Sequence, residues 1–259
     1  MTNPQIHTRE LPVVKAFSHM LSGISAHWLP AFKLALPWLI LLGALNAWAL
    51  NAKLPMSTPP AEFKLDPIDF IELILGFLAA SSIAVSWNRF ILLDSPFASE
   101  PSFRMDRIVW TYFGKNILIY AICLGPLLLL ALVSQLVTSP LLAVLILALF
   151  IQVLIFINRM SVSLPAIAIG KPTIGLKEAL EVTRGNNLRI LGLLGLTYLA
   201  IAIAFFAYLT IISILSTLGV GAMLVGAVIF GIPMQFFSAI INATLLTSLY
   251  GFFVEKRDF

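Results

Sequence analysis

INRMSVSLPAIAIGKPTIGLKEALEVTRGNNLRIL, residues 157–191, is the most charged and most punctuated stretch of an otherwise apolar chain. It leaves one long apolar run, contains a short segment of mixed polarity, and enters the next apolar run. A segment of this kind is typical of a short amphipathic helix between two membrane spans. The stretch therefore indicates a helical membrane protein.

The segment 173–184 has the pattern expected of that short helix. One face is expected to carry Leu176, Ala179, Leu180 and Thr183, and the other Lys177, Glu178, Glu181 and Arg184. Thr173 can cap the start of the helix, and Gly185 suits the left-handed position that ends it. Asn186 or Asn187 is then expected to cap the next span.

The composition is that of a membrane protein with little mass outside the bilayer. The 259 residues are 60% apolar and 11% charged, whereas soluble domains are about 45–50% apolar and about 25% charged. The net charge of +4 comes from basic residues between apolar runs, which favours a membrane surface over nucleic acid as partner. The single cysteine, Cys123, lies in an apolar run and allows neither an internal disulfide nor a zinc site.

The whole chain, 1–259, is predicted to form one all-α integral membrane domain. The six transmembrane helices are expected at about 30–50, 67–93, 108–137, 141–165, 188–216 and 220–253. They form three hairpins with short cytoplasmic amphipathic helices. Residues 1–12 are predicted to be a flexible arm, and 13–26 an interfacial helix on the membrane surface.

The basic residues predict the orientation. All but two of the 16 lysines and arginines fall on one side of the predicted spans, the exceptions being Lys53 and Lys64. The positive-inside rule therefore places both termini in the cytoplasm. No cleavable signal is apparent before the first span, so we expect the N-terminus to be retained.

A weak internal repeat accompanies the hairpins. Three times, a polar or amphipathic segment precedes a pair of apolar runs. The second run of the first two units ends in the same pair, Asn88-Arg89 and Asn158-Arg159. These matches predict a parallel repeat of three helical hairpins.

Four arginines near the expected cytoplasmic interface are the candidate site: Arg89, Arg159, Arg184 and Arg189. They can simply anchor helix ends at the lipid head groups. Alternatively, their guanidinium groups can hold a lipid phosphate in a shared pocket. The sequence leaves both interpretations open.

A transporter is the alternative to a lipid-binding module. Gly125-Pro126 and Gly231-Ile232-Pro233 can kink or break the third and sixth spans near mid-membrane. The polar residues within spans are read first as interhelical hydrogen-bonding groups; they are Gln135, Gln152, Gln235, Asn242, Thr210, Tyr120, Tyr198 and Tyr208. Asp69 and Glu72 fit helix-start chemistry better than a proton relay.

No catalytic constellation is predicted. The three histidines, His7, His19 and His27, have no metal-binding spacing, and no nucleophile elbow, phosphate-binding loop or paired acidic motif occurs. We therefore expect a protein that is not an enzyme and has no metal or cofactor site.

Several short motifs resemble a known membrane domain. They are SLPAIA (163–168), GLKEAL (175–180), TRGN (183–186), WNRFILL (87–93) and TSLY (247–250). They are similar to the multi-pass domain N-terminal to the catalytic domain of some glycerophosphodiester phosphodiesterases, and to stand-alone bacterial inner-membrane relatives. Family members often have histidine where this chain has Asn88. The catalytic barrel and its metal-binding acidic residues have no counterpart within 1–259, so the resemblance implies a membrane module without hydrolase activity.

Together these features predict a non-enzymatic protein of the bacterial inner membrane, acting as a lipid-associated scaffold or assembly module. The alternative is a small transporter, flippase or permease that uses the third and sixth spans. The expected partners are membrane lipids, anionic ones included, and a membrane protein or a second copy of the chain. Nucleic acid is not an expected partner.

Overall fold

The computed structural model describes residues 9–53, 67–94, 103–134, 140–171 and 174–259, and within these ranges every regular element is a helix. The helices are α1 (Val13–Ala26), α2 (Trp28–Lys53), α3 (Pro67–Leu93), α4 (Arg107–Ser134), α5 (Pro140–Ser161), α6 (Leu164–Ala168), α7 (Leu176–Val182), α8 (Asn187–Thr217) and α9 (Val220–Phe253). The all-helical fold predicted from the sequence is confirmed.

Within the described residues, six helical segments are long and apolar enough to cross a membrane, as predicted: α2, α3, α4, α5 with α6, α8 and α9. The predicted fourth span, 141–165, is not one continuous helix. α5 ends at Ser161, and the short α6 begins at Leu164 with proline as its second residue. Proline has no amide hydrogen and is favoured in a first helical turn, so it suits a new helix start rather than a helix interior.

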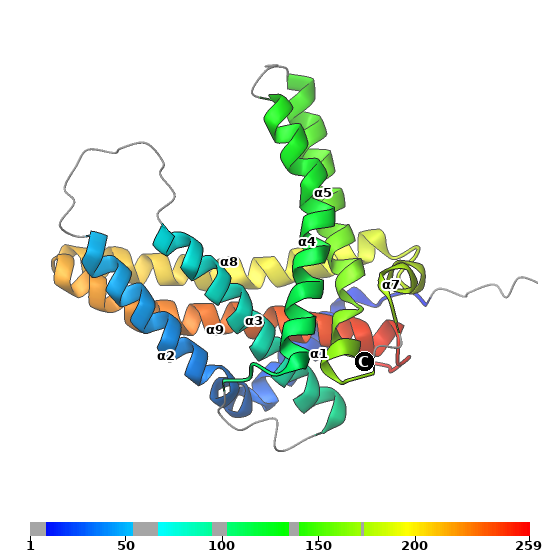
Figure 1. Cartoon of the computed structure of the whole chain (residues 1–259), viewed down its shortest axis with the longest axis horizontal. Coiled ribbons are helices and arrows are strands. Elements are labelled where there is room, and N and C mark those ends of the chain that lie inside the picture. Colours follow the sequence, from blue (N-terminus) through cyan, green and yellow to red (C-terminus); the bar gives the residue numbers. More distant parts are fainter. Residues whose placement is uncertain (1–8, 54–66, 95–102, 135–139, 172–173) are drawn as a thin grey trace, which may run out of the picture.

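The long helices pack in consecutive pairs that spread apart from a common end. α2 contacts α3, α4 contacts α5, and α8 contacts α9. In Figure 1, α4 and α5 stand upright while α8 and α9 run across the view. We call the end where the pairs converge, which also holds α1, α6, α7 and residue 259, the terminal end. The opposite ends of the pairs form the splayed end.

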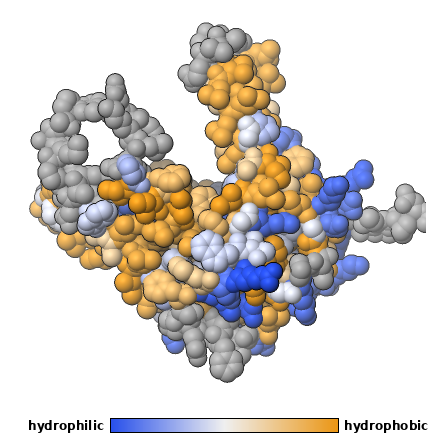
Figure 2. Space-filling view, viewed as in Figure 1, coloured by the Kyte–Doolittle hydropathy of each residue, from blue (hydrophilic) through white to orange (hydrophobic). Residues whose placement is uncertain are grey.

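Burial is concentrated at the terminal end. In α4 the buried residues lie between Val109 and Cys123, and in α8 they lie between Ile190 and Thr197. Beyond them, both helices expose large apolar side chains such as Leu128 and Ile203. Figure 2 shows hydrophobic residues covering the splayed end and hydrophilic ones gathered toward the terminal end. Such an apolar surface is suited to lipid contact.

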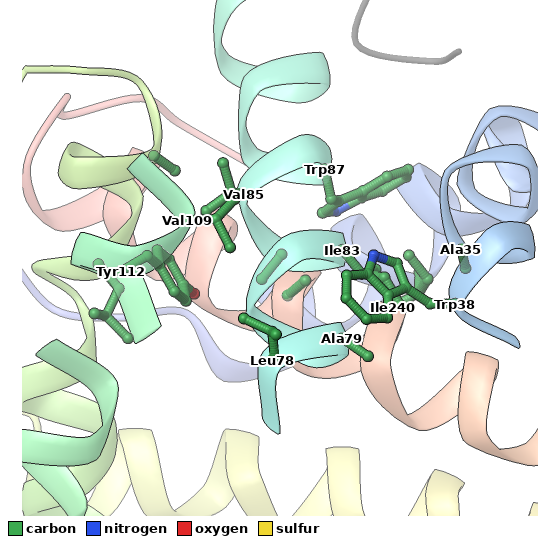
Figure 3. Close-up of a cluster of buried hydrophobic side chains, with 14 of the residues drawn as sticks. Ala35, Trp38, Leu78, Ala79, Ile83, Val85, Trp87, Val109, Tyr112 and Ile240 are labelled. Atoms are coloured by element: carbon green, nitrogen blue, oxygen red, sulfur yellow. The ribbon is translucent and has the colours of Figure 1, made fainter. Parts of the chain in front are cut away.

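Aromatic side chains form the centre of the core. Trp38 of α2 and Trp87 of α3 are fully buried, and Tyr112 of α4 lies in the same cluster with Ile240 of α9 (Figure 3). Large aromatic rings bury much apolar area and dominate such packing. Four helices are thus held together at one level, which leaves their far ends free to separate.

The prediction of a flexible arm over 1–12 is wrong for residues 9–12, while residues 1–8 lie outside the described part. Leu11 is buried, its amide donates to Asn186 Oδ1 at 2.9 Å, and Asn186 Nδ2 donates to the Arg9 carbonyl at 3.0 Å. The segment thus gains an apolar anchor and a two-point side-chain clamp. α1 follows directly and packs against α8 and α9, burying Ala16 and Met20.

The segment between α6 and α8 follows its sequence pattern with one change. Along α7, Ala179 and Thr183 are buried while the four charged residues are exposed. Gly185 has φ +81°, the left-handed conformation expected at this position. The helix starts at Leu176 with Gly175 at its cap position, whereas Thr173, the predicted cap, lies outside the described residues.

The contact between α8 and α9 depends on one glycine. A Cβ atom at Gly226 would lie 2.1 Å from Leu215 Cδ1, whereas a Cβ at Gly231 would meet nothing closer than the Tyr208 hydroxyl at 3.8 Å. We expect Gly226→Val to cost about 1–2 kcal/mol through overpacking. Gly231→Val in the same helix is the matched control and should cost less. Thermal unfolding in detergent measures both, and equal losses would contradict the prediction.

Candidate functional site

Arg159 is buried and fully engaged with the protein. Its Nε donates to Thr183 Oγ1 at 2.8 Å, its Nη1 donates to Asn187 Oδ1 at 3.0 Å, and its Nη2 donates to the Leu180 carbonyl. Its guanidinium also lies 5.7 Å from the ring centre of Phe156. Every one of these partners is neutral. Arg159 therefore joins α5 to α7 and to the start of α8, and its donors are turned toward protein rather than lipid.

The other three arginines have surroundings of their own. Arg184 is exposed, and Arg189 forms an exposed ion pair with Glu10 at 2.5 Å. Arg89 is half-buried near the end of α3, where the charged residue that it influences is Asp106. None of the four arginines lines either of the two cavities described below. A role in binding lipid phosphate stays a prediction for Arg89, Arg184 and Arg189.

Asp106 directly precedes α4 and forms a small charged cluster with Arg104 and Arg89. Its Oδ1 accepts the Val109 amide at 3.0 Å, and its Oδ2 pairs with Arg104 Nε at 3.0 Å. Burial alone would raise the pKa of Asp106, but these bonds and the charges of Arg104 and Arg89 outweigh it and lower the pKa below its usual value. The cluster is accounted for by helix capping.

The two Asn-Arg pairs share a local geometry. Asn88 Nδ2 donates to the Ala84 carbonyl at 2.7 Å, and Asn158 Nδ2 donates to the Leu154 carbonyl at 2.9 Å. Both bonds run four residues back along the same helix. Asn88 also accepts a bond from Thr247 Oγ1 of α9 at 2.9 Å, so it joins two spans.

The proline-containing helices are not broken. α4 continues through Gly125 and Pro126, and α9 continues through Gly231 and Pro233. A break that would expose backbone groups to a substrate is therefore not present in either helix, while the kinks at these glycines and prolines stay a prediction. A helix loses a single hydrogen bond at proline, and in apolar surroundings neighbouring groups compensate for it. None of the four residues lines the larger cavity.

A smaller cavity of about 190 Å³ lies at the terminal end, between α1, α3, α9 and the last residues of the chain. The C-terminal residues close over it. Phe259 stacks on Phe252 with ring centres 5.2 Å apart, and Arg9 lies 4.4 Å above the Phe252 ring. Arg9 also pairs with Asp258 and donates to the Arg257 carbonyl at 3.0 Å. These contacts join residue 9 to the last residues of the chain.

The larger cavity, of about 780 Å³, is the candidate site. It lies among the six long helices and is lined mainly by apolar side chains. Four of the polar residues singled out from the sequence line this cavity: Gln235, Asn242, Tyr120 and Tyr198. Gln152 and Thr210 are exposed and do not line it, Tyr208 does not line it either, and Gln135 lies outside the described residues.

Other polar lining residues were not predicted as site residues. They are Asn46, Glu72, Tyr112, Asn116, Asn158, Ser161 and Ser238. Glu72 was assigned to helix-start chemistry, but it lies in the second turn of α3 and faces the cavity. The signal for it was its position, because Glu72 lies deeper in the apolar run than Asp66 and Asp69, and a carboxyl group inside a membrane is costly. The side chain of Asp69 lies outside the described part.

Compared with protein-family models, curated proteins and solved structures, the chain gives no match.

Proposed function

We propose that this protein is a non-enzymatic integral membrane module that binds a lipid in the cavity between its helix pairs. The main observation behind this proposal is the cavity of about 780 Å³. It is large enough for a ligand and combines apolar walls with a few polar groups. An amphipathic molecule fits both properties. The apolar walls suit acyl chains, and the polar groups suit a head group.

In the proposed arrangement, three helical hairpins cross the bacterial inner membrane with both termini in the cytoplasm. α1, α6 and α7 then lie at the cytoplasmic interface, where the basic residues are concentrated. α8 has 31 residues and is therefore about 46 Å long, more than the roughly 30 Å hydrocarbon core. Strong tilting accommodates such a helix, and tilted pairs would leave room between them for lipid.

Lipid transport is the second candidate function, and the same cavity supports it. Gln235 and Asn242 bring polar groups to the cavity wall within apolar helices, as a path for a polar head group requires. Scrambling of labelled lipid in liposomes containing the purified protein tests this candidate. Scrambling would favour transport, and its absence despite lipid binding would favour a module that only holds lipid.

Gly76 offers a direct test of lipid binding. It lines the cavity, and a Cβ atom built there meets no atom within 4 Å. A larger side chain can therefore extend into the cavity from this position. We expect Gly76→Phe to fill part of the cavity and to lower the amount of co-purified lipid about fivefold, which is the effect of losing about 1 kcal/mol of affinity.

The matched control is Gly195→Phe in α8. Gly195 also has open space around its Cβ position, but it is exposed and lines neither cavity. Mass spectrometry of lipid extracted from both variants measures the difference. Equal lipid content in the Gly76 variant, the control and the unmodified protein would contradict lipid binding in this cavity.

A further inference from the structure

The asparagines of the larger cavity have a fixed orientation. Asn46 Nδ2 donates to the Leu42 carbonyl at 2.8 Å, and Asn242 Nδ2 donates to the Ser238 carbonyl at 2.8 Å. Asn158 makes the equivalent bond to its own helix. Because a carbonyl oxygen cannot donate, each of these contacts must be made by the amide nitrogen. The oxygen of each side chain is left without a protein donor within the described residues.

These three asparagines therefore present acceptors to the cavity. Three amide oxygens come from α2, α5 and α9, and each belongs to a residue that lines the cavity. The Ser238 hydroxyl donates to the Met234 carbonyl at 3.0 Å, so its oxygen also has only acceptor capacity left. A ligand that bonds to these oxygens must bring hydrogen-bond donors.

Glu72 adds a carboxyl group to the lining of the same cavity. Its Oε1 is buried and has no hydrogen-bond partner within the described residues. A buried carboxyl oxygen without a partner is costly, and the cost is removed when a ligand supplies a donor, most effectively a cationic one. Among the described residues, no lysine, arginine or histidine lines this cavity, so none of them supplies a cation to Glu72 there.

We propose that the cavity selects a phospholipid whose head group ends in a primary ammonium, held by Glu72 and by the amide oxygens. This inference rests on the proposed lipid-binding function and names the lipid class. A primary ammonium provides three N–H donors and a positive charge, which match several acceptors and one carboxylate. A quaternary ammonium has the charge but no N–H donor, and a glycerol head group has hydroxyl donors but no cation.

The test offers the purified protein an equimolar mixture of phosphatidylethanolamine, phosphatidylcholine and phosphatidylglycerol with identical acyl chains, and measures retained lipid by native mass spectrometry. We expect phosphatidylethanolamine to be enriched about tenfold over each of the others. One additional charge-assisted hydrogen bond would produce a difference of this size. In Glu72→Gln the enrichment should disappear while total bound lipid persists. Asn116→Asp adds a negative charge elsewhere in the lining and is the control. In this variant phosphatidylethanolamine should remain the preferred lipid.

The outcomes separate this inference from the function on which it rests. Lipid loss in the Gly76→Phe variant together with equal retention of the three lipids would leave lipid binding standing and overturn the ammonium assignment. Enrichment that survives in Glu72→Gln would also overturn it. Free ethanolamine carries the same ammonium without acyl chains, so its displacement of bound lipid at equal concentration would overturn the assignment to a lipid. An unchanged unfolding temperature in the Glu72 variant establishes that its fold is intact.

Discussion

Arg159→Gln is expected to lower the free energy of unfolding by about 2–4 kcal/mol, because hydrogen bonds to a charged group contribute more than neutral ones and their loss leaves buried acceptors unpaired. The guanidinium bonds α7 at two points and the start of α8 at a third. Glutamine cannot reach three acceptors in these directions. Arg159→Lys should lose nearly as much, since a single ammonium cannot reproduce the planar fork.

The chain carries its own probe for this measurement. Cys123 is the only cysteine, it is buried in α4, and its Sγ lies 3.7 Å from Met160 Sδ, next to Arg159 in sequence. A thiol-reactive fluorophore therefore reports the unfolding of this region on heating. Arg184→Gln is the control, because that arginine is exposed and its loss should cost little. If the variants at 159 and 184 melt together with the unmodified protein, Arg159 does not hold the helices.

The helices and their approximate ends were predictable because each depends on local composition. Continuous apolar runs of membrane length require helices, since every backbone polar group must be paired within the segment. Gly185 was predictable for the same reason, because its left-handed conformation is a local property. The break after Ser161 was not, because the polar residues around it suit the end of a span equally well and only the proline at 165 marked a new helix start.

The cavity was beyond sequence reasoning because it depends on how helix pairs diverge. The splay of α4 and α5 from α8 and α9 is a tertiary property with no sequence period. Gln235 and Asn242 were recognised as polar residues, but hydrogen bonding between helices explained them equally well. Asn46 and Glu72 gained significance only when the fold placed both in the lining of one cavity. Asn186 occupies the predicted cap position, yet its side chain clamps residues 9 and 11 instead of capping α8.

Replacing Asn186 or the adjacent Asn187 by aspartate should have opposite effects on stability. Asn186 is buried and uses both halves of its amide, with Oδ1 accepting from the Leu11 amide and Nδ2 donating to the Arg9 carbonyl. In Asn186→Asp one carboxylate oxygen would face that carbonyl oxygen, with no donor between them. Two buried acceptors in contact cost about 2–3 kcal/mol. The segment that precedes α1 should therefore detach.

Asn187→Asp should be neutral or stabilising by up to about 1 kcal/mol, the usual range for a partly exposed ion pair. Asn187 Oδ1 only accepts, from Arg159 Nη1, and aspartate keeps this acceptor while giving the arginine a carboxylate partner. Trypsin distinguishes the two variants, because cleavage after Arg9 or Lys15 requires the segment to leave its site. Asn186→Asp should be cleaved faster than the unmodified protein, and Asn187→Asp should not. Equal cleavage of the two variants would mean that the Asn186 clamp does not hold the N-terminal segment in place, since the two substitutions add the same charge one residue apart.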